Sequence, residues 1–247
     1  MQGKKVVVFM GPSLEAETAK KILDAEYRPP ASRGDIFNAV REGAQIIGLI
    51  DGVFFQACSI AHREILHALE NGVKVVGASS MGALRASELD LYGMEGVGRI
   101  YELYRGGELV SDGEVALIFE PDSFKPLSEP LVNIRYNLGL AEERGIINKE
   151  AKEKILRIAK SLYYPERDYE RILSVAEGEV EKKDLERLKK FLRGERRDLK
   201  REDAIEALRR IKDIYNHRYI KGGGCQNENT LAGCTVQLQL LRGVLPF

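Results

Sequence analysis

The chain of 247 residues has no tryptophan, three cysteines and three histidines. Few cysteines, odd in number, argue against a disulfide-stapled secreted domain and favour a reducing compartment, so we expect a cytoplasmic protein. No apolar run approaches the roughly 20 residues that a membrane-spanning helix needs, and the short apolar start is unlike a secretory signal. These absences favour a globular protein built around an ordinary hydrophobic core.

Other binding signatures are also missing. Acidic and basic residues balance at 38 each, so the bulk charge gives no sign of a nucleic-acid partner. The glycine motifs that cradle nucleotide phosphates are absent, which leaves a small-nucleotide binder as a weak third hypothesis. His62 and His67 do not share a helical face, and the spacing of Cys225 and Cys234 is not a zinc signature. No cofactor and no metal site is expected.

What the first half does contain is a regular alternation of apolar runs and amphipathic segments. This rhythm predicts βαβ units and a parallel sheet, hence an α/β fold. Proline pairs are incompatible with a helix interior, so Tyr27–Pro30 is interpreted as a loop. The predicted strands are 5–10, 45–50 and 73–76, and the predicted helices are 14–25, 36–42 and 59–70.

The second half is dense in Glu, Lys and Arg, with apolar residues at helical spacing. From Glu142 to Arg218 this pattern predicts four short helices, separated near Tyr164-Pro165, Glu177-Gly178 and Gly194. Their charges are interpreted as solvated helix faces. We therefore expect an α/β domain over 1–140, a charged helical region over 141–220, and a glycine-linked tail over 221–247.

The most informative segment is the turn from Gly77 to Arg85, which follows the third apolar run. A strand that turns sharply into a helix holds a serine hydroxyl in the open and aims the first amides of the helix at the same spot. Glycines are needed where the backbone reverses so closely. The spacing around Ser80 is G-x-x-S-x-G, so a turn whose Ser79 or Ser80 merely caps the helix is an equal alternative.

Three turns are predicted to meet at the carboxyl edge of the sheet, where ligands bind in such folds. They are Gly11-Pro12-Ser13, Asp51-Gly52 and the serine turn, and His62 follows closely in the next helix. Arg33 and Asp35, after the double proline, are candidates for the same edge. Asp51 is also explained as a turn former, and His62 as an ordinary surface residue.

Several of these segments together resemble the TfuA-like family. The resemblance covers roughly residues 4–135, and the run from Ser80 to Leu89 is nearly diagnostic. The helical second half carries no recognisable motif. The matching segments are Gly11–Leu14, Pro29–Ile36, Ile50–Gly52, His62–Leu66, Gly77–Leu89, Gly93–Gly98 and Asp112–Ala116.

The resemblance implies a role beside a YcaO enzyme in peptide-backbone thioamidation, in which an amide oxygen is exchanged for sulfur. It implies a hydrolase that releases sulfide from the C-terminal thiocarboxylate of a ThiS-type ubiquitin-like sulfur carrier. The protein would also help the YcaO partner to hold its peptide substrate. In archaeal methanogens that substrate is a glycine of methyl-coenzyme M reductase.

The family's site is described as a serine with a lysine, and carrying it over makes Ser80 the expected nucleophile. The resemblance places Arg63 where the family has lysine, and arginine does not lose its proton. His62 oriented by Asp51 is therefore the first choice of base. The alternative is a lysine brought in from elsewhere in the chain, such as Lys20 or Lys125, whereas Lys74 lies too far along its strand. Residues expected to bind substrate are Gly77, Ser79, Met81, Gly82, Arg85 and Asp35, with the amides of Met81 and Gly82 stabilising the oxyanion.

A non-catalytic adapter is the second hypothesis. In that case the protein docks carrier, YcaO enzyme and peptide together, and Arg33, Arg63 and Arg85 act as carboxylate clamps. Binding of both partners without release of sulfide would select it.

Overall fold

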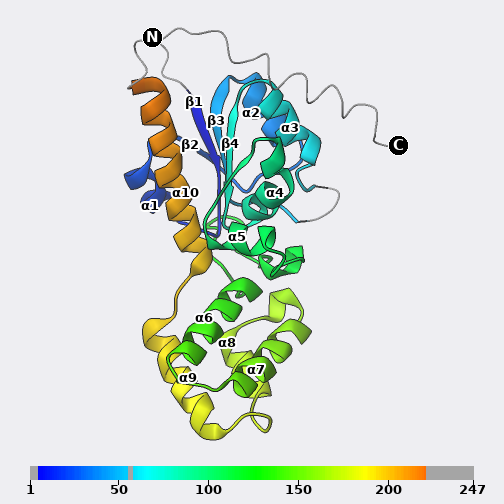
Figure 1. Ribbon diagram of the computed structural model, residues 1–247, viewed down its shortest axis with the longest axis vertical. Helices are drawn as coiled ribbons and strands as arrows, with labels where there is room; N and C mark the ends of the chain where they lie inside the picture. The colour runs from blue at the N-terminus through cyan, green and yellow to red at the C-terminus, as the bar shows by residue number, and fades with distance from the viewer. Residues whose placement is uncertain (1–4, 55–57, 221–247) are drawn as a thin grey trace, which may run out of the picture. The chain divides into compact units, whose positions relative to one another are not determined.

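Five parallel strands form the central sheet of the computed structural model, which describes residues 5–54 and 58–220 (Figure 1). Three of them are the apolar, largely buried runs, in which valine and isoleucine favour the extended backbone. The order across the sheet is β2-β1-β3-β4-β5. The strands are β1 (Lys5–Phe9), β2 (Glu26–Arg28), β3 (Ala44–Leu49), β4 (Lys74–Ala78) and β5 (Glu95–Val97).

The predicted α/β class and parallel sheet are confirmed, but the two edge strands were not predicted. Tyr27 and Arg28 were interpreted as loop, whereas β2 pairs Tyr27 with Val8 of β1. The residue before a proline is restricted to extended conformations, which suits an edge strand that stops at Pro29. β2 and β5 have three residues each, too few to show an apolar period.

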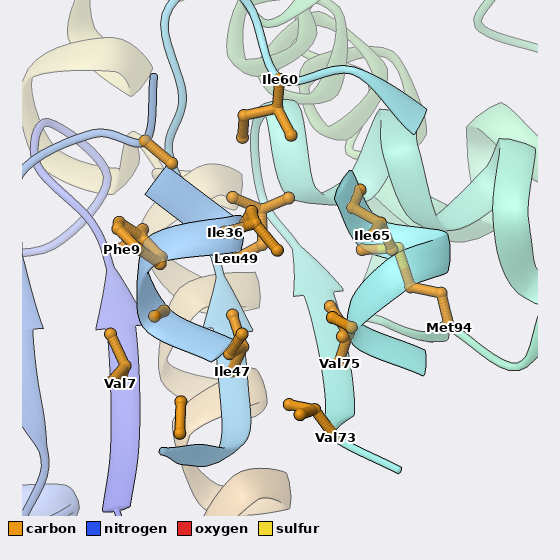
Figure 2. Packing of buried hydrophobic residues seen from close by; sticks show 14 of the residues in the cluster. Val7, Phe9, Ile36, Ile47, Leu49, Ile60, Ile65, Val73, Val75 and Met94 are labelled. Atoms are coloured by element: carbon orange, nitrogen blue, oxygen red, sulfur yellow. The ribbon is translucent and has the colours of Figure 1, made fainter. Parts of the chain in front are cut away.

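Helices cover one face of the sheet through a continuous apolar cluster (Figure 2). Val7 and Phe9 of β1 and Ile47 of β3 point to this face, where they pack against Ile36 and Ile65 from two of the helices. The helices predicted at 14–25 and 59–70 are present and shorter, and the helix predicted at 36–42 begins and ends one residue earlier. The first five α-helices among the described residues are α1 (Ala16–Ile22), α2 (Asp35–Arg41), α3 (His62–Glu70), α4 (Met81–Leu89) and α5 (Arg99–Arg105), of which α2, α3 and α4 supply the buried helix residues of this cluster.

The strand order places a topological switch point between β1 and β3. The segments that follow β1 and β3 turn toward opposite sides of the sheet. In doubly wound sheets, ligands bind in the crevice that this leaves at the carboxyl ends of the strands. The residues that follow β1 and β3 at this point include Ser13 and Asp51. The fold thus brings two of the predicted turns to the position where a site is expected.

Four helices follow in the charged half, as predicted, within the described residues up to 220. A fifth helix precedes them and runs through the expected domain boundary at residue 140. Contacts group the described residues up to 213 into one unit, which contains all ten described α-helices except the last two residues of α10. The helices are α6 (Leu131–Glu143), α7 (Lys149–Ser161), α8 (Tyr169–Val175), α9 (Lys182–Glu195) and α10 (Leu199–Tyr215).

The last of these helices returns to the sheet (Figure 1). A Cβ atom at Gly48 of β3 would lie 2.7 Å from the Ile211 side chain of α10, so this glycine lets the helix pack closely on the strand. Asp203 of α10 accepts hydrogen bonds from the amides of Arg99 and Ile100, at 3.0 and 2.8 Å, and so caps α5. Burial raises the pKa of Asp203 to about 7.

Among the described residues, the helices are all too short or too polar to cross a membrane. The predicted tail, 221–247, with Cys225 and Cys234, lies outside the described residues.

Candidate active site

The serine turn holds its backbone in an unusual conformation at Ser79. This residue has φ of +67°, and the amide of Ser80 donates a 2.7 Å hydrogen bond to the carbonyl of Ala78. A bond that spans a single residue with positive φ is a γ-turn of the strained type. Such a conformation costs on the order of 1–3 kcal/mol in a residue other than glycine and clusters at functional sites.

Two glycines let α4 begin directly against the strands. A Cβ atom at Gly82 would lie 1.7 Å from the carbonyl oxygen of Leu49, and one at Gly77 would lie 2.3 Å from the oxygen of Gly82. Neither clash can be relieved by rotating a side chain, because the opposing atoms belong to the backbone. The sharp strand-to-helix turn predicted from the sequence is therefore present, and it depends on these two positions.

The two serines of the turn differ in their partners. Ser79 is fully buried and Ser80 is 1% exposed, so the expectation of an open hydroxyl is not met. The Ser79 hydroxyl donates to the Ser13 hydroxyl over 2.9 Å. For Ser80 no side-chain hydrogen bond is found within the described part of the chain. The polar connections of the turn run through Ser79.

Asp51 joins the three turns at the switch point. Its Oδ2 accepts the amides of Gly11 and Ser13, at 2.9 and 3.0 Å, and its Oδ1 accepts the Ser13 hydroxyl at 2.7 Å. The carboxylate therefore fixes the loop after β1 and receives the end of a chain of hydroxyls that starts at Ser79. The predicted meeting of the three turns is confirmed.

A lysine that the sequence did not indicate completes this cluster. Lys200, in the first turn of α10, is 2% exposed, and its Nζ lies 3.9 Å from Oδ1 of Asp51. The same nitrogen donates to the carbonyl of Val115 over 3.0 Å. Burial lowers the pKa of Lys200, and the nearby Asp51 charge opposes this only in part. Lys200 is an amine suited to take or share a proton.

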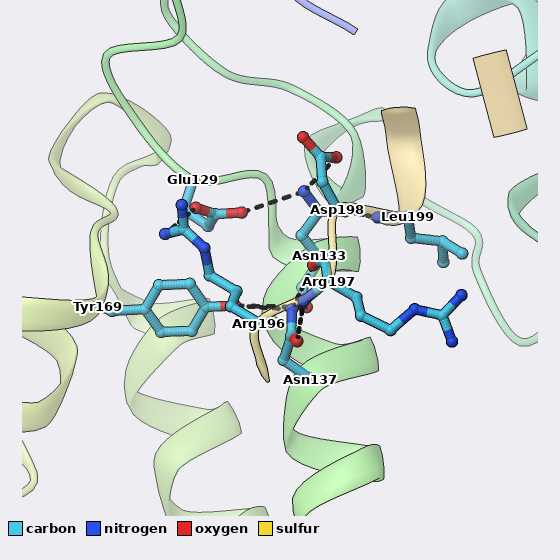
Figure 3. A network of polar contacts seen from close by, with 8 residues as sticks. All are labelled: Glu129, Asn133, Asn137, Tyr169, Arg196, Arg197, Asp198 and Leu199. Atoms are coloured by element: carbon cyan, nitrogen blue, oxygen red, sulfur yellow. Dashed lines mark hydrogen bonds and ion pairs between the residues drawn. The ribbon is translucent and has the colours of Figure 1, made fainter. Parts of the chain in front are cut away.

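The start of α10, which carries Lys200, is held by a polar network (Figure 3). The side-chain oxygen of Asn133 on α6 accepts the amides of Leu199 and Lys200, at 3.0 and 3.3 Å. One turn later on the same helix, Asn137 binds both the amide and the carbonyl of Arg197, each at 2.8 Å. The network satisfies the first donors of α10 and so fixes the backbone that carries the buried lysine.

His62 lies outside the cluster around Asp51. Its Nε2 is 2.8 Å from the carboxylate of Glu88, which also receives Arg85, and its side chain is half exposed. Both oxygens of Asp51 are occupied by the Gly11–Ser13 loop, and a His62–Asp51 hydrogen bond is not formed between these described residues. The predicted orientation of His62 by Asp51 is therefore not what the structure contains.

The remaining charged candidates are also separate from this cluster. Arg63 is exposed on α3, whereas its neighbour Glu64 is buried and accepts the amides of Gly34 and Ala61. Asp35 accepts the amide of Ser32 and closes its own loop, and Arg85 donates to the carbonyl of Ile60. The alternative base Lys20 is paired with Glu17 at the surface, and Lys74, already rejected as too distant, is exposed at the start of β4, so neither resembles Lys200.

The amides of Met81 and Gly82, which were expected to stabilise an oxyanion, differ in whether they already have an acceptor. The Gly82 amide donates to the carbonyl of Ile50 over 3.3 Å and is therefore engaged. The Met81 amide has no acceptor among the described residues, and it belongs to the first residue of α4, where the helix dipole favours negative charge. The Met81 side chain is buried over Gly52, so its role there is packing.

A cavity of about 510 Å³ adjoins the cluster on the side of α10. Lys200 and Pro12, the neighbour of Ser13, form part of its wall, as does the alternative base Lys125. Among the described residues there is no group of three His, Cys, Asp or Glu side chains placed to hold a metal ion. The chemistry offered by this site is that of hydroxyls, a carboxylate and a buried amine.

Residues 51–168 match the family model described as TfuA-like protein. No curated protein matches the chain. The matched segment contains Asp51 and both serines of the turn, whereas Ser13 and Lys200 lie outside it.

Proposed function

Because this chain belongs to the TfuA-like family, which acts in YcaO-associated thioamidation, we propose that it is a serine hydrolase of protein thiocarboxylates. Its substrate is the C-terminal thiocarboxylate of a ThiS-type sulfur carrier, and its product, sulfide, supplies the YcaO partner. The observation that carries this proposal is the hydrogen-bonded series from Ser79 through Ser13 to Asp51, with Lys200 beside it.

We assign the nucleophile to Ser79 in place of Ser80. The Ser79 hydroxyl has a proton acceptor at 2.9 Å and sits on the strained γ-turn, whereas Ser80 has neither feature. A serine is a weak nucleophile until a neighbouring group takes its proton. Here the proton passes through the Ser13 hydroxyl to the Asp51 carboxylate, whose charge is shared with the amine of Lys200.

The reaction proceeds in two steps. In the first, Ser79 Oγ bonds to the thiocarboxylate carbon, the C–S bond breaks, and the serine proton leaves with sulfur as hydrosulfide. In the second, water adds to the ester, releasing the carrier carboxylate, restoring the serine and yielding one proton. The Met81 amide is the donor that we assign to the oxyanion in both steps, a contribution of about 3–4 kcal/mol for a single donor.

The burial of Ser79 imposes a condition on this mechanism. A fully buried hydroxyl meets a substrate only when the residues that cover it move, so turnover requires the binding of the carrier, of the YcaO partner, or of both. Free small thioacids, which bring no binding energy from a protein surface, are expected to be poor substrates.

Sulfide release from a purified thiocarboxylated carrier, measured with and without the YcaO partner, tests the proposal. We expect release by the native chain and a fall of about a thousandfold or more in Ser79→Ala. Ser80→Ala is the matched control, since it removes the same atom from the next residue, and we expect a fall below about tenfold. Undiminished release by Ser79→Ala would remove that serine as nucleophile.

A non-catalytic adapter is favoured by one observation, namely that neither serine hydroxyl is open in this structure. In that case the cluster around Asp51 only stabilises the fold, and the protein brings carrier and YcaO enzyme together. Tight binding of both partners with no sulfide released over many hours, with the YcaO enzyme present, would select the adapter.

A further inference from the structure

The first turns of α10 carry two buried ionisable side chains, Lys200 and Asp203, each 2% exposed. Three positions separate them, so they lie on the same side of the helix. The Lys200 amine donates to the carbonyl of Val115 over 3.0 Å. Asp203 accepts the backbone amides of Arg99 and Ile100 at the start of α5. This side of α10 therefore binds both ends of the segment from residue 99 to residue 115.

The contact of Asp203 with α5 depends on a glycine. Gly98, which precedes α5, has φ of +91° and offers no side chain to cap that helix. A Cβ atom at Gly98 would lie 2.4 Å from the carboxyl carbon of Asp203. The carboxylate from α10 thus occupies the place of a local capping side chain, and each of its oxygens binds one amide. The contact fixes α10 against the start of α5.

The backbone of α10 is held from a second side by α6. The side-chain oxygen of Asn133 accepts the amides of Leu199 and Lys200. Because Asn133 and Asp203 connect α10 to different elements, together they restrict both sliding of the helix along its axis and rotation about it. Sliding by one residue position moves a helix by about 1.5 Å and turns its side chains by about 100°, which would take Lys200 away from Asp51.

Among the described residues, Asp203 touches none of the proposed reacting groups. Both of its oxygens bind backbone amides, whereas the Nζ atom of Lys200 lies 3.9 Å from Oδ1 of Asp51. Lysine has a flexible four-carbon stem, so the position of its amine depends on where the helix backbone is held. An effect of Asp203 on the reaction must therefore pass through α10 and Lys200.

We propose that Asp203 is a positioning residue, which holds α10 so that the Lys200 amine stays beside Asp51. The inference rests on the proposed function for the catalytic role of Lys200. A purely structural cap of α5 is the alternative, and such a cap would affect the free energy of unfolding without acting through Lys200.

A double-mutant cycle on sulfide release separates the two roles. Asp203→Ala is measured in the native chain and in Lys200→Met, which retains the hydroxyl series and Asp51 and should keep a reduced but measurable rate. In the native background we expect Asp203→Ala to lower kcat at least about tenfold and to leave KM within about twofold. In the Lys200→Met background it should change kcat less than about twofold, because residues that act as a unit are not additive.

Asn148→Ala is the matched control. Asn148 caps α7 by accepting the amide of Ala151 over 2.8 Å, so the substitution removes a cap from a helix that does not carry Lys200. We expect Asn148→Ala to change kcat less than about twofold. An equal fall in kcat for Asp203→Ala and Asn148→Ala would overturn the inference, and so would an equal Asp203→Ala effect in both backgrounds.

Acetylation of the Lys200 amine by acetic anhydride tests the position of that group without turnover. Modified Lys200 is quantified by mass spectrometry, at a temperature where circular dichroism shows each variant to be folded. Because Lys200 is buried, we expect slow modification in the native chain and at least about tenfold faster modification in Asp203→Ala. Asn148→Ala should change the rate less than about twofold. An unchanged rate in Asp203→Ala would contradict the positioning role.

Asp203→Asn replaces Asp203→Ala in both measurements if the alanine variant does not fold. The amide side chain has the same size but a single acceptor oxygen, so it retains one of the two backbone hydrogen bonds. We expect changes in the same direction of at least about threefold, in kcat and in the rate of Lys200 acetylation. No change in either quantity would overturn the inference.

The two proposals fail separately. If no sulfide is ever released but Asp203→Ala accelerates acetylation of Lys200, the hydrolase falls and Asp203 still positions the amine. If sulfide is released but the effects of Asp203→Ala and Lys200→Met on kcat are independent, the hydrolase stands and the positioning role falls.

Discussion

The strand-end turns and the start of α10 contribute to one cluster by different means. The turns are held by features of the backbone: positive φ at Ser79, glycines that permit close approach, and amides that donate to Asp51. The backbone amide of Lys200 instead donates to the side-chain oxygen of Asn133 on α6, a residue 67 positions earlier in the chain. The α/β part therefore does not contain the whole site, and the helical part supplies its buried amine.

This difference has consequences for stability. Removing the Asp51 carboxylate takes away the acceptor of two loop amides and leaves the buried Lys200 amine without a counter-charge. Removing the Lys200 side chain still leaves Asp51 with three hydrogen-bond donors. We therefore expect the two halves of this pair to respond unequally to substitution.

The largest effect is expected for Asp51→Ala. Loss of the partner from a buried ion pair costs about 3–5 kcal/mol, and the free energy of unfolding should fall by that amount. Lys200→Met, which keeps an apolar stem of similar length, should cost about 1–2 kcal/mol or less. Urea denaturation of both variants measures the contrast, and equal losses would contradict the unequal roles assigned to the pair.

Two glycines in different helices are expected to differ in how they tolerate an added methyl group. Gly82→Ala places a methyl group against the Leu49 carbonyl and should cost about 3 kcal/mol or more, because overpacking against backbone cannot be relieved locally. In Gly139→Ala on α6 the added methyl meets no atom within 4 Å and should stabilise by about 0.5–1 kcal/mol. Thermal unfolding gives both values, and a tolerated Gly82→Ala would show that the turn is looser than described.

The contact between α10 and α5 predicts a pH dependence. The pKa of Asp203 is raised by burial to about 7, so the folded state binds a proton more tightly than the unfolded state does. This contribution is present in full below the unfolded pKa and is lost as the pH rises through 7. Between pH 8 and pH 5 stability should increase by about 2–3 kcal/mol from this group. Asp203→Asn should remove that slope, and an unchanged slope would assign it to other groups.

The strand-end turns of the site were largely predictable from sequence, because glycines and turn residues indicate them locally. Glycine spacing indicated the sharp turn at Ser79 and Ser80, and turn residues after successive apolar runs indicated that Ser13 and Asp51 share an edge of the sheet. Which serine carries the strained φ depends on one backbone rotation. Sequence spacing does not determine that rotation, so the expected nucleophile was one residue away from the residue we now assign.

The buried lysine at the start of α10 was not predictable in this way. Lys200 lies in a charged stretch that is typical of a solvated helix face, and only the packing of α10 on the sheet buries it. Its position depends on a contact between α6 and α10 that no local pattern reports. The two short edge strands were missed for a related reason, since three residues show no period.

The smallest effect is expected for His62→Ala. The histidine is half exposed and its partner Glu88 also pairs with Arg85, so its loss should cost below about 1 kcal/mol of stability. Sulfide release should stay within about threefold of the native rate. A fall of a hundredfold or more in the rate of sulfide release would identify His62 as the base and would contradict a role for Lys200 in proton transfer.

The most direct test of the account is to locate the covalent intermediate. Thiocarboxylated carrier mixed with the protein and its YcaO partner is quenched in acid within the first turnovers, and the digest is sequenced by mass spectrometry. The account predicts the carrier's C-terminal residue joined through an ester to Ser79. An ester on Ser80, or rapid sulfide release with no ester on either serine, would contradict it.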